Sequence, residues 1–237
     1  QASYPFWSPQ GDMIGYFQSN QNMVGASLQK VFIQDGSSKL VCNIPDSLGT
    51  QFGNAVWTAE GEIIMSIGGS LYTVSDQGGE PRIFLAQNFS EEDVRIWSLT
   101  LLPDKKSILC IVTKQDGSCE VVALSGDTQT TIFTSQESLR SLCYASSGYI
   151  IYQRGGQLYT SQGIWARPFD LASLRVTGDH MLIDANGIYP SVSSEGTLVY
   201  GVGLTALGEV HLVWVDRDGR VGDTIGQIQV GISDAAI

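Results

Sequence analysis

Phe6-Trp7-Ser8-Pro9-Gln10-Gly11-Asp12 is followed by the apolar run Met13–Phe17, and this phrase returns four more times along the chain. Each copy consists of an aromatic or apolar anchor, a short polar turn and an apolar run. Self-similarity at one regular interval indicates a supersecondary unit that buries its apolar face against its neighbours. The anchors of the five copies, 43 to 50 residues apart, are Trp7, Trp57, Leu101, Tyr144 and Val192.

Each repeat is predicted to contain four short strands. The first strand ends in the phrase, and its Pro and Gly make a tight turn, because Pro presets φ and Gly accepts positive φ. The second strand is the apolar run, the third alternates in polarity, as in Ser70–Val74, and the fourth is short, as in Arg82–Leu85. Repeated units of four antiparallel strands are typical of β-propeller blades. The sequence therefore predicts an all-β fold, a single β-propeller domain over residues 1–237.

Five repeats are recognisable, and they are predicted to form a five-bladed ring or part of a ring of six to eight blades, within the known range of about 4 to 8. Residues 160–176 are interpreted as an insertion in the fourth repeat, and the last repeat is expected to break off after Asp223. An open ring would leave unpaired strand edges and favour self-association. The approximate blades are 4–51, 52–97, 98–139, 140–187 and 188–227.

Composition narrows the classes of partner. The net charge is −11, and the sequence contains no cluster of basic residues. A nucleic-acid partner is not expected, because its phosphates need a positive surface. The sequence contains no run of about 18 apolar residues, so this segment is not expected to insert directly into a membrane. The four cysteines, at positions 42, 110, 119 and 143, are interpreted as buried free thiols.

The repeats resemble the TolB-type, Pro-Asp-motif relatives of WD propellers, in which an aromatic residue, Ser, Pro, Asp and Gly precede a buried strand. More closely, they resemble the propeller regions at the extracytoplasmic end of bacterial eukaryotic-like serine/threonine protein kinases. Gln10 and Glu60 depart from the pattern, because the consensus has Asp there. The stretches that carry the resemblance are Phe6–Pro9, Leu71–Ser75, Gly78–Pro81, Leu102–Asp104, Ser147–Tyr152, Ala166–Asp170 and Leu212–Arg220.

The resemblance implies a non-catalytic sensor or interaction module that binds a protein, peptide or glycan. It implies a periplasmic or extracellular location, with membrane anchoring through a segment outside this chain. Two alternatives remain open. The chain could be the propeller domain of a peptidase or hydrolase whose catalytic domain is absent here, or a structural module for assembly at the cell surface.

Motifs of catalysis and metal binding are scarce, so we expect no enzymatic activity, no cofactor and no metal site. His180 and His211 are the two histidines, and no His-Glu-x-x-His, Cys-x-x-Cys or Gly-x-Ser-x-Gly motif occurs. Gly201–Ala206 matches a loose dinucleotide fingerprint but precedes a predicted strand rather than a helix, so it is interpreted as a hairpin loop. Asp216–Gly219 is interpreted as a hairpin turn rather than half of a calcium loop.

A recognition surface is expected on one rim of the ring. Loops that join a fourth strand to the next blade share a rim with the loops between second and third strands, and these loops vary while the strands repeat. The predicted loops are 43–55, 86–97, 134–140 and 184–190, and Trp165 is a further candidate for a ligand contact. The residues predicted to bind the ligand at this rim and the channel mouth are Asn54, Arg95, Trp97, Arg140 and Tyr189.

Overall fold

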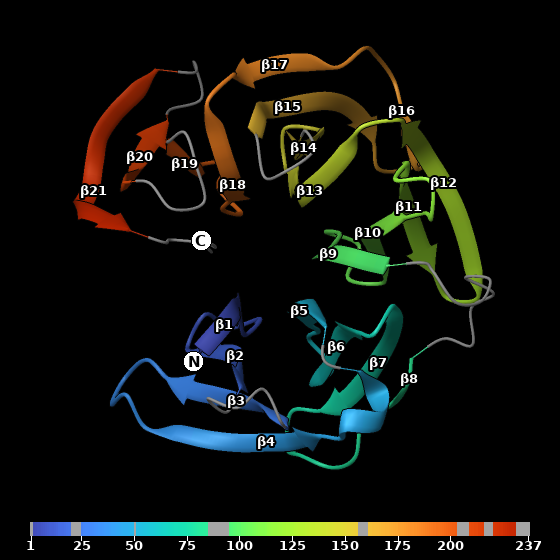
Figure 1. Ribbon diagram of the computed structural model, residues 1–237, viewed down its shortest axis with the longest axis vertical. Helices are drawn as coiled ribbons and strands as arrows, with labels where there is room; N and C mark the ends of the chain where they lie inside the picture. The colour runs from blue at the N-terminus through green and yellow to red at the C-terminus, as the bar shows by residue number, and fades with distance from the viewer. Residues whose placement is uncertain are drawn as a thin grey trace.

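Five antiparallel sheets surround a common axis (Figure 1). The computed structural model describes residues 2–19, 25–49, 51–84, 95–155, 161–202, 209–215 and 220–230. Each of the five predicted repeats forms one sheet, and no α-helix occurs within these ranges. The prediction of an all-β propeller is confirmed, and the described residues form five blades without a sixth.

The strands follow one another from the axis outward in each of the first three blades. The first blade contains β1 (Ala2–Trp7), β2 (Met13–Ser19), β3 (Ala26–Phe32) and β4 (Ser38–Ile44), followed by the 3-10 turn η1 (Asp46–Leu48). The second contains β5 (Phe52–Trp57), β6 (Glu62–Ile67), β7 (Ser70–Ser75) and β8 (Arg82–Ile83). The third contains β9 (Arg95–Leu101), β10 (Ser107–Thr113), β11 (Cys119–Ser125) and β12 (Thr128–Ser135).

The last two blades follow the same order. The fourth contains β13 (Ser138–Ala145), β14 (Tyr149–Gly155), β15 (Ser161–Asp170), β16 (Arg175–Val176) and β17 (Met181–Asp184). The fifth contains β18 (Gly187–Val192), β19 (Leu198–Val202), β20 (Glu209–Val215) and β21 (Val221–Val230).

Two sequence-based interpretations of these blades are wrong. Residues 160–176 are not an insertion, because β15 is the third strand of the fourth blade and pairs with β14, β16 and β17. Pro168 lies within β15 and pairs with Tyr149, although proline is usually excluded from paired strands. The predicted third strand at residues 157–159 lies outside the described residues. The fifth repeat also continues beyond Asp223, because β21 extends to Val230.

The repeated phrase forms the same turn between the first and second strands of every blade. The N–H at the fourth position after the anchor donates to the carbonyl of the first residue after the anchor, for example Gly11 to Ser8 at 2.9 Å and Gly61 to Thr58 at 3.1 Å. The donor residue has positive φ in every blade. These residues are Gly11 (71°), Gly61 (81°), Lys105 (59°), Gly148 (86°) and Gly196 (85°).

The hydrophobic core lies between neighbouring blades rather than within any one of them. Ile63 and Met65 of β6 pack against the first blade, while Ile64 of the same strand faces the third blade. Four clusters of buried side chains join the first blade to the second, the second to the third, the third to the fourth and the fourth to the fifth. No corresponding cluster joins the fifth blade to the first among the described residues.

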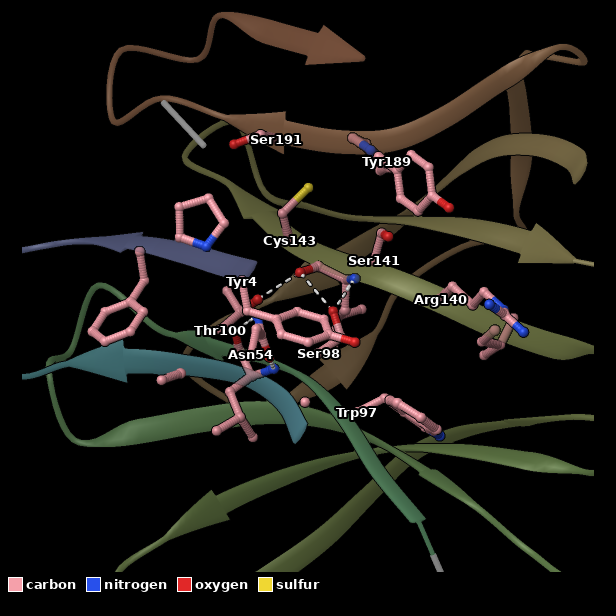
Figure 2. A pocket seen from close by; sticks show the side chains of 18 of the residues that line it. Tyr4, Asn54, Trp97, Ser98, Thr100, Arg140, Ser141, Cys143, Tyr189 and Ser191 are labelled. Carbon is pink, nitrogen blue, oxygen red and sulfur yellow. Dashed lines mark hydrogen bonds between the residues drawn. The ribbon is translucent and has the colours of Figure 1, made fainter. Parts of the chain in front are cut away.

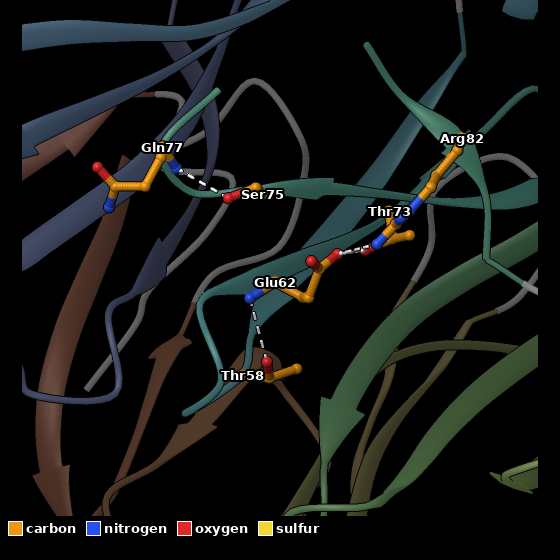
Figure 3. A network of polar contacts seen from close by, with 6 residues as sticks. All are labelled: Thr58, Glu62, Thr73, Ser75, Gln77 and Arg82. Carbon is orange, nitrogen blue, oxygen red and sulfur yellow. Dashed lines mark hydrogen bonds and ion pairs between the residues drawn. The ribbon is translucent and has the colours of Figure 1, made fainter. Parts of the chain in front are cut away.

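Polar contacts join the outer strands of the second blade (Figure 3). Glu62 Oε2 on β6 accepts hydrogen bonds from Thr73 Oγ1 at 2.7 Å and from Arg82 Nη2 at 3.1 Å. Three strands are thereby connected through one carboxylate. Because the Arg82 side chain is largely exposed, this ion pair is expected to contribute little to stability.

The four cysteines are free thiols, as the sequence predicted. Cys42, Cys110 and Cys119 are buried, whereas Cys143 is half-buried, and all four are unpaired. Burial raises the pKa of the Cys110 thiol to about 12, so it is protonated at neutral pH.

Replacing Gly11 by Ala tests the repeated turn. A Cβ at Gly11 meets nothing within 4 Å, so the cost comes only from positive φ. We expect the free energy of unfolding to fall by about 1 kcal/mol, measured by urea denaturation. Lys105→Ala is the matched control and should change it by less than about 0.5 kcal/mol, because an L-residue with a side chain already occupies that position. Equal losses in both variants would contradict this account.

Candidate functional site

A pocket of about 700 Å³ lies at the axis of the ring, where the innermost strands of all five blades meet (Figure 2). Its lining comes from β1, β5, β9, β13 and β18, with Thr113 added from β10. Pockets of this size hold small molecules or short oligomers. Every blade therefore contributes to one shared site.

A β-bulge interrupts each innermost strand where it borders the pocket. In β9, Ser98 and Leu99 lie between the pairs Trp97–Ile111 and Thr100–Leu109. Comparable register shifts occur in the other four innermost strands. Bulges re-aim side chains next to functional sites. Here the two bulge residues of every blade belong to the lining of the pocket.

Four of these bulges contain a residue other than glycine with positive φ. Such a conformation costs about 1 to 2 kcal/mol per residue, because Cβ approaches the following carbonyl. Strain of this kind is concentrated at functional sites in proteins. The four residues are Tyr4 (53°), Ser98 (56°), Ser141 (49°) and Tyr189 (51°).

Side chains at the bulge of one blade, or next to it, form hydrogen bonds to the bulge of the next blade. Asn54 Nδ2 on β5 donates to Leu99 O at 3.0 Å, and Asn54 Oδ1 accepts the Leu99 N–H. One blade further, Ser98 Oγ accepts the Leu142 N–H, and Thr100 Oγ1 donates to Leu142 O at 2.6 Å. We call each of these side-chain contacts to the next blade's bulge an inter-blade latch.

The five predicted binding residues all line the pocket. They project from strands rather than from the expected loops, because the innermost strands begin earlier than the sequence indicated. Asn54 lies on β5, Arg95 and Trp97 on β9, Arg140 on β13 and Tyr189 on β18. Asn54 has a structural role as a latch, while the part that these residues take in binding stays a prediction.

Trp165 lies away from this pocket, on β15. Its ring packs edge-on against His180 at 5.2 Å and lies 4.5 Å from the Arg154 guanidinium. Arg154 also forms an ion pair with Glu137 at 2.6 Å. These contacts explain Trp165 by packing within the fourth blade. Gly203–Ala206 of the fingerprint and Asp216–Gly219 lie outside the described residues.

Sequence reasoning missed most of the hydroxyl-bearing side chains of the pocket. Counting three residues back from each anchor would have found Tyr4, Ser98 and Ser141, since that position borders the axis in every blade, but not the other five. The residues missed are Ser3, Tyr4, Ser98, Thr100, Thr113, Ser138, Ser141 and Ser191.

Among the described residues, the charged side chains at the pocket have one sign. Arg95 and Arg140 are its charged lining residues, and no Asp or Glu is among the described residues that line it. Burial raises the pKa of the Cys143 thiol to about 12, although part of this residue faces the pocket. The thiol is therefore neutral at physiological pH. A site with guanidinium groups, aromatic rings and hydroxyls favours an anionic ligand with polar substituents.

Within the described ranges, no group of three or more His, Cys, Asp and Glu side chains is arranged to hold a metal ion. None of the helices in those ranges is both long and apolar enough to span a bilayer.

The fold and the axial pocket define a five-bladed β-propeller domain. No protein-family model and no curated protein matches the sequence. TolB from Acinetobacter baumannii is similar in structure, with a TM-score of 0.70 at 13% identity, over 93% of this chain and 53% of TolB. This chain therefore spans about half of that protein.

Two enzymes have similar structures. A gluconolactonase from Xanthomonas campestris matches with a TM-score of 0.70 at 12% identity, over 99% of this chain and 77% of the enzyme. An oligogalacturonate lyase from Vibrio parahaemolyticus matches with a TM-score of 0.61 at 7% identity, over 96% of this chain and 65% of the lyase. At these identities, the similarity shows the fold alone.

These comparisons correct one expectation and support another. The prediction that this chain is not an enzyme is contradicted, because the same fold occurs in a gluconolactonase and in a lyase. Missing motifs of other enzyme families gave no sound basis for excluding catalysis. The TolB-like propeller fold that the resemblance implied is confirmed.

Replacing Asn54 by Ala tests the latch between the second and third blades. The buried Leu99 N–H and C=O would lose their partners, so we expect the free energy of unfolding to fall by about 1 to 3 kcal/mol. Asn186→Ala, at an exposed turn residue, serves as the control. Urea denaturation measures both variants, and a loss below about 0.5 kcal/mol for Asn54→Ala would contradict a stabilising latch.

Proposed function

We propose that this domain binds an acidic oligosaccharide in its central pocket. The observation that carries the proposal is the charge of the lining. In a chain with a net charge of −11, the charged residues in the described lining of the pocket are Arg95 and Arg140. A guanidinium offers paired N–H donors in the geometry that a carboxylate accepts.

The rest of the lining fits a sugar. The rings of Tyr4, Trp97 and Tyr189 border the pocket and supply apolar faces with polar edges. Serine and threonine hydroxyls both donate and accept hydrogen bonds, as sugar hydroxyls do. The volume of about 700 Å³ suits a short oligosaccharide better than the surface of a folded protein.

The comparisons and the sequence resemblance add support of different kinds. The oligogalacturonate lyase is named for an acidic oligosaccharide, and the gluconolactonase for the lactone of a sugar acid. The resemblance to kinase-associated propeller regions supports a location outside the cytoplasm. On this proposal, the domain presents a glycan sensor within a membrane-anchored signalling protein.

A second candidate is an enzymatic role on the same class of ligand. The presence of two enzymes among the similar structures favours it. Either this chain would act on the oligosaccharide directly, or it would present the ligand to a catalytic domain elsewhere in the parent protein.

Isothermal titration calorimetry with trigalacturonate tests the proposed ligand class. We expect neutral galactotriose to bind at least about tenfold more weakly, and Arg140→Gln to raise the Kd for trigalacturonate about tenfold, because a charge-assisted hydrogen bond is lost. Arg95→Gln should act in the same direction. Arg82→Gln, on the outer edge of the second blade, is the matched control and should leave the Kd unchanged.

Each alternative has its own outcome in this experiment. Equal binding of the neutral and acidic sugars would contradict recognition of a carboxylate. Binding of a tetraglutamate peptide in place of trigalacturonate would indicate a peptide ligand. Mass spectrometry of the recovered sugar distinguishes the enzymatic candidate, since cleavage yields shorter products.

A further inference from the structure

Ser98 and Ser141 occupy the same position in adjacent blades. Each lies three residues before its anchor, within the bulge of an innermost strand, with a φ of 56° and 49° respectively. Both are half-buried and both line the pocket. The local backbone therefore gives the two hydroxyls equivalent settings.

Only one of the two hydroxyls acts as a latch. Ser98 Oγ accepts the N–H of Leu142, the second bulge residue of the next blade. The residue that corresponds to Leu142 in the fifth blade is Pro190, which has no N–H to donate. Ser141 therefore cannot form the latch that Ser98 forms.

The fourth and fifth blades are joined differently. The buried Gln153 side chain accepts the Tyr189 N–H through Oε1 at 2.9 Å. No hydrogen bond joins Ser141 Oγ to another residue within the part of the chain that the structure describes. Figure 2 shows dashed lines at Ser98 and none at Ser141, whose hydroxyl points toward the side of the pocket where Tyr189 lies.

We propose that the Ser141 hydroxyl anchors the ligand, as a specificity-determining residue of the pocket. It lies next to Arg140 in the sequence, and Tyr189 of the fifth blade faces it. A sugar carboxylate at Arg140 would bring a ring or carboxylate oxygen within reach of the hydroxyl, which donates a hydrogen bond to that oxygen. This inference rests on the proposed function, because it requires a ligand in the pocket.

Paired alanine variants separate a ligand contact from a structural one. We expect Ser141→Ala to raise the Kd for trigalacturonate about tenfold, since a hydrogen bond to an anionic ligand is lost. Its melting temperature should stay within about 1 °C of the wild type. Ser98→Ala should lower the melting temperature by about 3 °C, because an inter-blade latch is lost.

Pro190→Ala tests whether the missing N–H of Pro190 leaves the Ser141 hydroxyl able to contact the ligand. Alanine supplies a backbone N–H at the position that corresponds to Leu142 of the preceding blade. The Ser141 hydroxyl should accept a hydrogen bond from this N–H, and the Kd for trigalacturonate should rise. In the Ser141→Ala background, the same change should have no further effect on the Kd. Such non-additivity is expected only if both substitutions act through one hydroxyl.

The outcomes that would overturn this inference are distinct. An unchanged Kd for Ser141→Ala, with trigalacturonate still bound by the wild type and weakened by Arg140→Gln, refutes the anchor and leaves the proposed function standing. A fall in melting temperature as large as that of Ser98→Ala shows a structural role instead. Failure of the wild type to bind trigalacturonate refutes the proposed function and this inference together.

Discussion

Packing between neighbouring blades is the constraint on which the rest of this structure depends. A four-stranded sheet has two faces, and the middle blades carry large apolar side chains on both of them. Ile63 and Ile64 are adjacent in β6 and face opposite ways, yet they are 0% and 3% exposed. One blade cannot bury both faces by itself. The innermost strands are therefore brought together at one axis, and the pocket is a consequence of that arrangement.

The repeat makes the scaffold regular, but the pocket is not symmetric. Where the next blade offers an N–H at the bulge, as at Leu99 and Leu142, an Asn or Ser side chain is used to join the blades. Pro5 and Pro190 stand at the corresponding positions of the first and fifth blades. Proline removes the donor, so the Ser141 hydroxyl has no backbone N–H at Pro190 from which to accept a hydrogen bond. The pocket lining thus contains side chains that form hydrogen bonds to the next blade, such as Asn54 and Ser98, and the Ser141 hydroxyl, which does not.

Much of the fold could be predicted because the period of the phrase and the alternation of polarity are local properties of the sequence. The site was harder to predict. Arg140 and Tyr189 were assigned to loops, since a bulge breaks the alternation that marks a strand. The spacing from the anchor marks the position of Ser141 but not its role, because that role depends on Pro190, which is distant in sequence and lines the same pocket. Residues 160–176 were interpreted as an insertion, whereas β15 is a paired strand that includes Pro168 despite the usual exclusion.

The negative charge of the chain and the positive charge of its pocket have separate origins. Several acidic side chains stabilise turns, where hydrogen bonds from a nearby serine lower the pKa of Asp35, Asp116 and Asp170. Such carboxylates are solvated, and salt screens their fields within about 10 Å. At the axis, two arginines lie among apolar and hydroxyl groups without a lining carboxylate among the described residues. The net charge therefore describes the surface, whereas selection of a ligand depends on the local field that it meets inside the ring.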